Sequence, residues 1–428
     1  MSLLTKAARQ TTKALSFTPH VQSAALPMPV SATDLTSRFQ ALDAFLIEHQ
    51  HLWRPKPFTH RQLPWEAEHP ELSTWLRQRS LEDAEAAHNR PEALEAPEPF
   101  AQIARQSRAL SEVDALPTHE LNTVSSRMSV EVPGRKWQQI EAFASSLNFR
   151  QTPTHWLDWC AGKGHLGRRL AHDGQALTCL EYDASLVEAG RRLSDKLGVH
   201  GNHLRQDVMA EDAADQLKAH HTPVALHACG DLHVRLMQLA ANARCKQMAI
   251  APCCYNRIAS DRYQALSLEG QASALSLSLD DLGLPLSETV TAGARVRRQR
   301  DSSMARRLAF DLLQRQLRGL DDYLPTPSLP SAWLDKPFDD YCRDLAALKH
   351  LPAPHHQDWH ALEATGWQRL AEVRNLELVR NLFRRPLELW LILDRALYLQ
   401  QRNYRVQIGT FCPTPVTPRN LLILAEQE

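Results

Sequence analysis

The spacing of hydrophobic residues changes along the chain and predicts three regions of different structure. Residues 34–120 carry apolar positions at helical spacing, which predicts an N-terminal region made mostly of helices. Residues 128–262 alternate short apolar runs with amphipathic stretches, a pattern typical of parallel strands joined by helices. Residues 263–385, rich in Leu, Arg and Pro, predict a second helical region. Within the first region, the Ala-, Glu- and Pro-rich segment 84–98 predicts an exposed linker.

The end of the chain returns to the strand pattern. PLELWLILDRALYLQQRNY predicts a helix, and two strands follow it, YRVQIGTF and NLLILAEQ, separated by the turn-forming PTPVTPRN. Together with the apolar runs between residues 154 and 254, these strands predict an α/β sheet of Rossmann-like type. Residues 126–262 and 386–428 would form one nucleotide-binding domain, residues 1–125 an N-terminal helical region, and residues 263–385 a helical insertion before the last strand pair.

Composition and charge exclude several classes of protein. The 428 residues are 43% hydrophobic, enough for a packed core, and no apolar run reaches the roughly 18 residues of a membrane span. The eight cysteines form no CxxC pair, so a reduced, cytoplasmic protein is predicted. Formal net charge is zero, so overall charge does not indicate a nucleic-acid partner. The first 33 residues hold no acid, which is typical of a transit peptide or of an unstructured basic N-terminus.

A Gly-x-Gly pair follows the first apolar run of the predicted sheet. In HWLDWCAGKGHLG, Asp158 precedes Gly162 and Gly164. Glycines in a strand-to-helix turn let the backbone approach a ligand closely, and the next helix offers free N–H groups to a negative group. An acid placed before this loop suits the amino acid part of S-adenosylmethionine better than a pyrophosphate. These residues therefore predict part of a cofactor site.

Two further acids follow at the expected ends of strands. Glu181 ends the second strand, where an acid accepts hydrogen bonds from ribose hydroxyls. Asp207 lies where the third strand should end and could meet an adenine amine, and Met209 could pack on the adenine. S-adenosylmethionine is therefore the predicted cofactor. An NAD enzyme and a fold with an inactive pocket are the alternatives.

At this point the motifs resemble a known family. DWCAGKGHLG, LEYD, HACGDL and APCCYN, together with the tail DRALYLQQRNYRV and TPRNLLILA, resemble class I S-adenosylmethionine-dependent methyltransferases. The group includes the methyltransferase-like protein twenty-five branch and the glutathione S-transferase C-terminal domain-containing branch, and more distantly a tRNA 2′-O-methyltransferase family. Arg135 and Lys136 stand where the family has basic residues. The resemblance covers about 128–262 and 386–428. It implies a class I fold and methyl transfer, but it does not settle the acceptor.

Candidates for the chemistry follow the fourth and fifth predicted strands. Methyl transfer needs alignment above all, and a base only where the acceptor is a weakly acidic hydroxyl. His227 and Asp231 in HACGD, with Tyr255 in APCCYN, are the candidate catalytic residues. Cys254 and Asn256 are candidates for contact with the acceptor, on which Tyr255 could also stack. The structural alternatives are a satisfied core histidine for His227, a helix N-cap for Asp231 and an ordinary turn for the APCCYN residues.

The cysteines of the same motifs allow two less favoured interpretations. Cys229 and Cys253 follow adjacent strands, as do the cysteines of RNA cytosine-C5 methyltransferases, although the Asp-x-Pro-Cys signature of that class is missing. Cys229, Cys253 and Cys254 could also hold a metal together with His227 and His233, but their spacing matches no standard zinc pattern. The sequence therefore predicts no metal site.

Two arginine-rich stretches raise the question of RNA. ARVRRQRDSSMARRLAFDLLQRQLRG holds eight arginines and two aspartates, and LVRNLFRRPLELW adds Arg380, Arg384 and Arg385. Such helices beside the pocket could follow phosphates, or they could be solvated faces paired with acids. The sequence thus favours methyl transfer to a macromolecule, with RNA preferred. The alternatives are a protein or small-molecule acceptor, or a non-catalytic cofactor sensor or scaffold.

Overall fold

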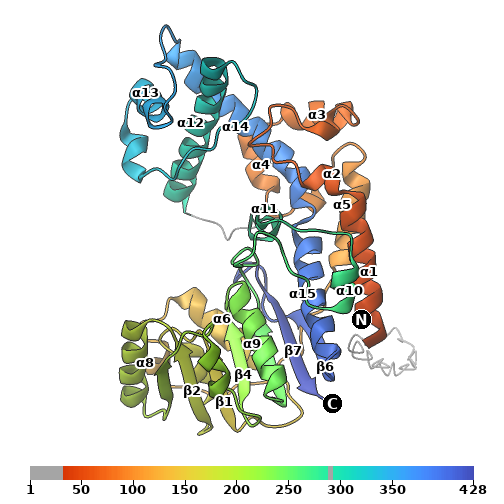
Figure 1. Ribbon diagram of the computed structural model, residues 1–428, viewed down its shortest axis with the longest axis vertical. Coiled ribbons are helices and arrows are strands. Elements are labelled where there is room, and N and C mark those ends of the chain that lie inside the picture. Colours follow the sequence, from red (N-terminus) through yellow and green to blue (C-terminus); the bar gives the residue numbers. More distant parts are fainter. Residues whose placement is uncertain (1–31, 288–292) are drawn as a thin grey trace, which may run out of the picture.

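The computed structural model describes residues 32–287 and 293–428. The molecule is elongated, with a sheet and its helices at one end and a group of helices at the other, which includes α12 (Ala294–Arg318) and α14 (Trp359–Asn381) (Figure 1). The prediction of a transit peptide or basic N-terminus falls on residues outside this described part, except for the first residues of helix α1 (Ala32–Glu48).

One sheet carries the strands of the chain. Its members are β1 (His155–Trp159), β2 (Ala176–Glu181), β3 (Asn202–Arg205), β4 (Thr222–Leu226), β5 (Gln247–Ala251), β6 (Tyr404–Thr410) and β7 (Leu421–Gln427). Their order is β3-β2-β1-β4-β5-β7-β6. The first five are parallel, and β7 is antiparallel to both β5 and β6. The predicted α/β, Rossmann-like sheet of the class I methyltransferase fold is therefore confirmed.

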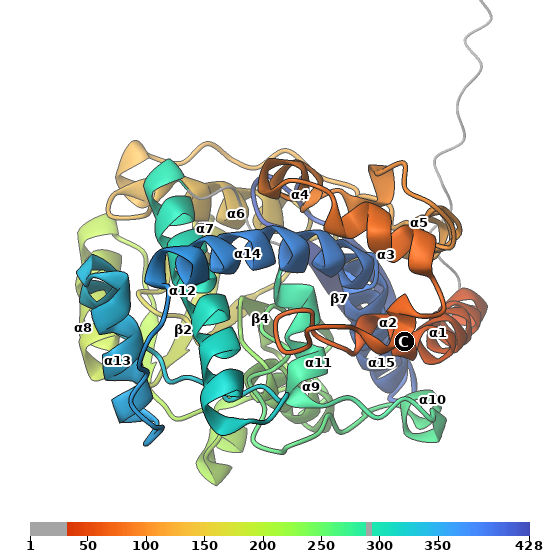
Figure 2. The same ribbon diagram turned by 90° about the horizontal axis from the view of Figure 1, so that it is seen from above.

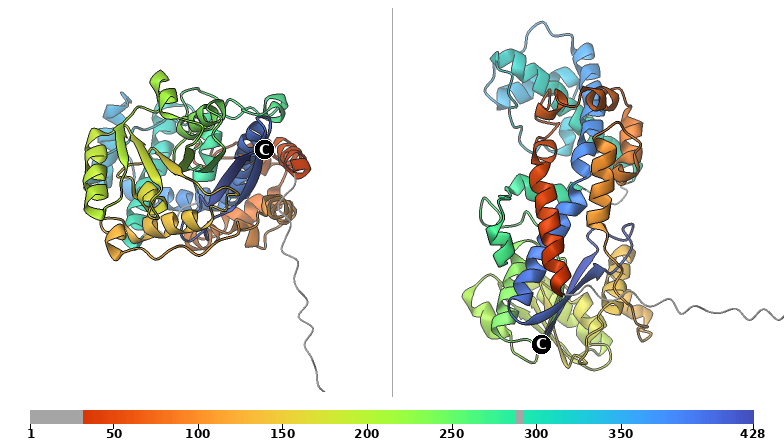
Figure 3. Two further views of the ribbon diagram at one scale, coloured as in Figure 1. Left: turned by 90° about the horizontal axis from the view of Figure 1, so that it is seen from below. Right: turned by 90° about the vertical axis from the view of Figure 1, so that its right-hand side faces the viewer.

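Helices cover both faces of this sheet because both faces of its strands are apolar. In β1, Trp156 faces a core formed with α6 (Gly134–Ser145) and α7 (His165–Leu170). Leu157 faces the other core, formed with α9 (Asp231–Asn242). Figure 3 (left) shows the sheet between these two layers. The carboxyl ends of the parallel strands thus meet at one edge, where α/β sheets bind their ligands.

Helix α15 (Arg384–Gln400) joins the sheet to the N-terminal helices. Its residues from 384 to 399 are buried except for Arg385, because it lies between the sheet and α1 (Figure 3, right). Phe39 of α1 packs on Trp390 with ring centroids 5.1 Å apart, and Phe45 stacks on Phe383 at 5.2 Å. One hydrophobic core therefore crosses the predicted boundary between the N-terminal region and the sheet.

The far end of the molecule is a separate packing of helices. Figure 2 shows α12 crossing α14, and the crossing is close because Gly366 has no side chain: a Cβ there would lie 2.6 Å from the carbonyl oxygen of Ala305. The remaining helices are α2 (Gln50–Trp53), α3 (Pro70–Arg77), α4 (Leu81–Ala87), α5 (Phe100–Ser111), α8 (Ala184–Leu197), α10 (Leu268–Ala272), α11 (Leu279–Leu282) and α13 (Phe338–Leu348). Short 3-10 helices are η1 (Pro64–Glu66), η2 (Pro91–Ala93), η3 (Ser126–Ser129), η4 (Glu211–Gln216), η5 (Leu284–Ser287) and η6 (Ser331–Asp335).

The segment 84–98 is not the exposed linker that its composition predicted. It contains the end of α4 and all of η2, and Ala84, Ala87 and Pro91 are buried. Its small apolar residues face neighbouring helices, chiefly α14, which a single stretch of sequence cannot reveal. Among the described residues, no helix combines the length and apolar character that crossing a membrane requires.

Candidate functional site

The loop after β1 turns sharply at the carboxyl edge of the sheet. Cys160, Gly162 and Gly164 have φ angles of 57°, 57° and 69°. A left-handed conformation at the non-glycine Cys160 is uncommon and marks a constrained backbone. The amide of Gly164 donates to the carbonyl of Ala161 at 2.8 Å, and α7 starts directly afterwards.

The two glycines of this loop differ in their surroundings. A Cβ at Gly162 would meet no atom within 4 Å, so the space above it is open. A Cβ at Gly164 would lie 2.7 Å from Cε1 of His203 and 3.0 Å from Sγ of Cys179. Gly164 is therefore required by packing of the loop against β2 and β3. The prediction that both glycines make room for a ligand is supported by the geometry of Gly162 only.

Glu181 reaches across this loop from the end of β2. One carboxylate oxygen accepts the amide of Gly162 at 2.8 Å and the other accepts the amide of Asp183 at 3.0 Å. The carboxylate is thereby fixed beside the open space above Gly162. The next residue, Tyr182, is 65% exposed.

Asp158 lies beneath the loop and is 3% exposed. Its carboxylate accepts the amide of Gly167 in the first turn of α7 at 2.9 Å. Burial raises the pKa of Asp158 to about 7, although that hydrogen bond and the charges of Arg168 and Lys136 act in the opposite direction. Asp158 therefore anchors the loop, and its carboxyl can change charge near neutral pH.

The predicted cofactor acids surround one cysteine. Burial raises the pKa of Cys160 to about 12, and the charges of Glu181, Asp158 and Asp207 add to this. Asp207 is exposed two residues beyond β3 and accepts the amide of Met209 at 2.9 Å, and Met209 is 45% exposed. The structure thus brings these acids to one place. Sequence reasoning missed Cys160, because its unusual φ angle leaves no signal in the residue type.

His227 lies just beyond β4, which ends at Leu226. Its φ angle is 69°, and its Nε2 forms a 2.6 Å hydrogen bond with Oε1 of Gln139. Burial, followed by the charges of Lys136 and Arg419, lowers its pKa to about 4. His227 is therefore neutral at pH 7 and held in place by Gln139, a partner that the sequence does not indicate.

Three thiols meet at the same edge. The sulfurs of Cys229 and Cys253 are 3.3 Å apart without a disulfide, and Cys254 lies close enough to complete a three-thiol group. Hydrogen bonding from the Cys253 thiol lowers the pKa of Cys229 to about 6, while the pKa values of Cys253 and Cys254 are raised. These hydrogen bonds favour the thiolate form of Cys229 over those of its two neighbours, which the sequence did not predict.

The two histidines considered with these cysteines are engaged elsewhere. The buried His233 bonds through Nδ1 to the carbonyl of Ala228 at 2.9 Å, and its Nε2 accepts Nε of Arg395 at 2.7 Å. His227 is bonded to Gln139. Of the five residues considered as metal ligands, a metal at this edge could therefore be bound by the three cysteines alone.

Tyr255 does not face the edge where an acceptor would bind. It is fully buried, its hydroxyl lies 3.4 Å from Oε1 of Glu388, and the guanidinium of Arg395 lies over its ring. The prediction that Tyr255 stacks on an acceptor or takes part in catalysis is therefore wrong, because its aromatic body belongs to the core shared with α15. Asn256, the next residue, lies half-buried in the turn.

Asp231 links two loops of the same edge. It is the first residue of α9, whose N-cap is Gly230, so the capping alternative is wrong. Its carboxylate accepts the amide of Ala259 at 2.7 Å, and its own amide donates to the carbonyl of Arg257 at 3.0 Å. Asp231 holds the segment after β5 against α9, and a direct catalytic role remains a prediction.

The arginines of α12 mostly serve the fold. Arg315 pairs with the buried Asp311 at 2.9 Å, and Arg307 donates to Thr326 at 2.6 Å. Five of the eight have such partners: Arg300, Arg306, Arg307, Arg315 and Arg318. The interpretation as a paired structural helix fits most of α12, and the second arginine stretch lies elsewhere, at the junction of α14 and α15.

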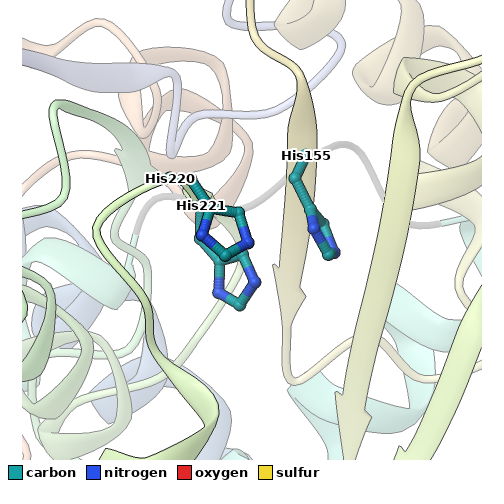
Figure 4. Close-up of side chains that lie close together, drawn as sticks. All are labelled: His155, His220 and His221. Atoms are coloured by element: carbon teal, nitrogen blue, oxygen red, sulfur yellow. The ribbon is translucent and has the colours of Figure 1, made fainter.

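Three histidines gather at the opposite edge of the sheet (Figure 4). His155 begins β1, and His220 and His221 precede β4, with ring centroids 4.3 Å apart for His155 and His221. Their nitrogens are close enough to share a metal ion. However, Nδ1 of His221 accepts the amide of Lys218 at 3.2 Å, and Nε2 of His155 bonds to Oγ1 of Thr178 at 2.9 Å, so two of the three rings already have partners. We assign this cluster a structural role.

The comparisons with known proteins agree with this geometry. Residues 135–261, which contain β1 to β5 and the loops described above, match a family model described as a methyltransferase domain. The chain is 34% identical over 137 residues to a glutathione S-transferase C-terminal domain-containing protein of Xenopus laevis. That match covers 31% of this chain and 21% of the relative, so the chain corresponds to about a fifth of the relative's length. Residues 135–261 thus match the methyltransferase domain family, in agreement with the class I methyltransferase fold of the sheet.

Proposed function

We propose that the protein uses S-adenosylmethionine to methylate a macromolecular acceptor, with RNA favoured. The observation that carries this proposal is the pair formed by Gly162 and Glu181. Above Gly162 there is open space, and the Glu181 carboxylate is fixed beside it by two backbone amides. A carboxylate in this position accepts the hydroxyls of a ribose.

The residues present fit the whole cofactor. Glu181 would hold the ribose, Asp207 and the exposed Met209 would meet the adenine, and the loop at Gly162 with Asp158 beneath it would receive the amino acid part. When bound, the cofactor supplies an electrophilic methyl group on a sulfonium. The protein then has to align the acceptor and exclude water, which provides much of the rate enhancement of such reactions.

The neutral His227 supports a role in orienting or deprotonating the acceptor. The lowered pKa keeps His227 unprotonated at pH 7 but also makes it a weak proton acceptor, so orientation of the acceptor is the better supported of the two roles. Cys254 and Asn256 flank the same edge and would contact the acceptor. The eight free cysteines suit a reducing compartment, so we place the protein in the cytoplasm.

The test uses the full chain with tritiated S-adenosylmethionine and an extract of cells lacking the protein. We expect label in the RNA fraction, and none with Glu181→Ala. Label in the protein or small-molecule fraction would replace RNA by one of the alternative acceptors. Tight cofactor binding by calorimetry without transfer to any fraction would indicate a sensor or scaffold, and no binding at all would overturn the proposal.

A further inference from the structure

A cavity of about 1160 Å³ lies where segments far apart in the sequence meet. Its walls come from residues 89–92, the end of α5, the junction of α14 and α15 at 381–385, and the β6–β7 loop at 410–420. Arg135, at the start of α6, completes the lining. None of these residues except Arg135 lies in the segment that matches the methyltransferase family model.

The cavity adjoins the carboxyl edge of the sheet. Because β7 is antiparallel to β5, with Ile250 paired to Ile423, the loop that precedes β7 lies beyond the carboxyl end of β5. The charge of Arg419 in this loop contributes to the lowered pKa of His227 and acts against the raised pKa of Cys254, so the loop lies near both residues. The loop also binds α6, since Gln139, the partner of His227, donates to the carbonyl of Val416 at 3.0 Å.

The lining is strongly basic. It contains two acids, Glu92 and Glu112. It contains five arginines: Arg90, Arg108, Arg135, Arg384 and Arg385. Burial, followed by the charges of Arg384 and Arg374, lowers the pKa of the neighbouring His88 to about 4, so His88 is uncharged at pH 7 and adds no opposing negative charge beside Arg384. A cavity with this charge attracts anions.

Hydrogen bonds fix the orientation of two arginines of the lining. Arg385 donates to Oε2 of Glu388 at 2.7 Å and to Oδ1 of Asn420 at 3.0 Å, and Arg384 donates to the carbonyl of His88 at 2.8 Å. Fixed guanidinium groups lose little conformational freedom when they bind an anion. Glu388 also contacts Tyr255, so this wall is tied to the segment after β5.

Unsatisfied polar atoms point to a ligand as well. Asn381 is only 4% exposed, and neither its Nδ2 nor its Oδ1 has a hydrogen-bond partner among the described residues. The Oγ of Ser111, also in the lining, is buried without a described partner. Buried polar groups are normally hydrogen-bonded, so such atoms in a cavity wall indicate a group that the protein alone does not supply.

From these observations we infer that the cavity binds the phosphate groups of a single-stranded RNA acceptor and delivers it to the methyltransferase edge. The choice of RNA as the ligand rests on the proposed function. The new part is where the RNA binds: in the cavity, rather than on the arginine face of α12. Arginines spread over several walls suit a chain of phosphates better than a single anion, and Asn381 and Ser111 can donate to phosphate oxygens.

The test compares two pairs of arginines in the full chain. Arg90 and Arg135 lie exposed at the cavity, and neither has an ion-pair partner within residues 32–287 and 293–428. Arg295 and Arg298 are exposed at the start of α12 and serve as the matched control. Binding is measured by fluorescence anisotropy with a labelled single-stranded RNA of about 12 nucleotides, a length within the range of single-strand sites.

We expect Arg90→Glu with Arg135→Glu to weaken RNA binding at least tenfold and to flatten its salt dependence, since phosphate contacts release counterions. Arg295→Glu with Arg298→Glu should change the affinity less than twofold. Three results would overturn the inference. They are an equal loss of RNA affinity in both pairs, a loss in the α12 pair alone, and displacement of the RNA by polyglutamate as readily as by unlabelled RNA. Unchanged thermal melting shows that each variant is folded.

Calorimetry with S-adenosylmethionine separates this inference from the proposed function. We expect the cavity variants to bind the cofactor as the wild type does. Cofactor binding without RNA binding by the wild type would overturn the cavity assignment alone. RNA binding that depends on the cavity arginines, without any cofactor binding, would support the cavity and overturn the proposed enzyme.

Discussion

At the scale of single residues, Asp158, Gly162, Glu181 and Asp207 gather around one loop at the carboxyl edge of the sheet. Their place could be predicted because their offsets from the strands are fixed by the fold, whereas their contact with a cofactor remains a prediction. Tyr255 could not be placed, because a residue just beyond a strand can turn toward the ligand or into the core, and the choice depends on Glu388, far away in the sequence.

The two glycines of the loop make a matched pair for mutation. Gly162→Ala should abolish cofactor binding, because its Cβ enters the open space proposed for the cofactor. The left-handed backbone at this position should add a modest loss of stability of about 1–2 kcal/mol. Gly164→Ala should lower the melting temperature further, since its Cβ would collide with His203 and Cys179. Calorimetry and thermal melting check this. Undiminished cofactor affinity in Gly162→Ala would contradict the site.

We extend the proposed function by one contact, between the Asp158 carboxylate and the amino group of the cofactor's amino acid part, and this contact predicts a pH-dependent affinity. The pKa of Asp158 is raised to about 7 in the free protein, and an ammonium group binds the ionised form. Affinity should therefore rise with pH, roughly eightfold between pH 6 and 7.5 for a pKa of about 7. Titration calorimetry at both pH values tests this, and Asp158→Asn should show weaker binding with no pH dependence. A flat profile in the wild type would refute the contact.

At the scale of elements, the strand order and the terminal strand pair followed from hydrophobic patterning, because parallel buried strands read as short apolar runs. The packing of α1 and α5 on α15 did not follow, since periodicity shows which face of a helix is apolar but not which partner covers it. The prediction that segment 84–98 is an exposed linker was wrong for the same reason.

Helix α15 fixes the start of the helical insertion through one buried carboxylate. Asp394 is fully buried and accepts from the amides of Leu266 and Ser267 at 2.9 Å and from the hydroxyl of Tyr263 at 2.6 Å. Asp394→Ala should destabilise the protein by about 3–5 kcal/mol, because it leaves these buried donors without an acceptor. Urea unfolding measures this. As a control, Asp280→Ala, which removes an exposed partner of Lys56, should cost less than about 1 kcal/mol. Equal losses of stability in the two variants would contradict the role given to Asp394.

At the scale of the whole molecule, buried neutral histidines predict sensitivity to acid. Burial lowers the pKa to about 4 for five of them: His88, His165, His203, His221 and His227. Their pKa is lower in the folded than in the unfolded chain, so the unfolded chain binds more protons between pH 6.5 and 4. Stability should therefore be intact above pH 6.5 and fall as the pH drops through this window.

Urea unfolding at pH 7 and pH 5 checks this expectation, with a loss of more than about 1.4 kcal/mol per pH unit if more than one histidine contributes. Replacing His221 by Gln should reduce the loss. Constant stability over this range would show that these rings are protonated in the folded protein.

The cavity beside the methyltransferase edge also has a consequence for partial unfolding. Its walls include residues 89–92 and residues 410–420, which lie far apart in the sequence. The cavity therefore exists only while both walls are in place. Local opening at either wall would remove it while the strands β1 to β5 stay paired.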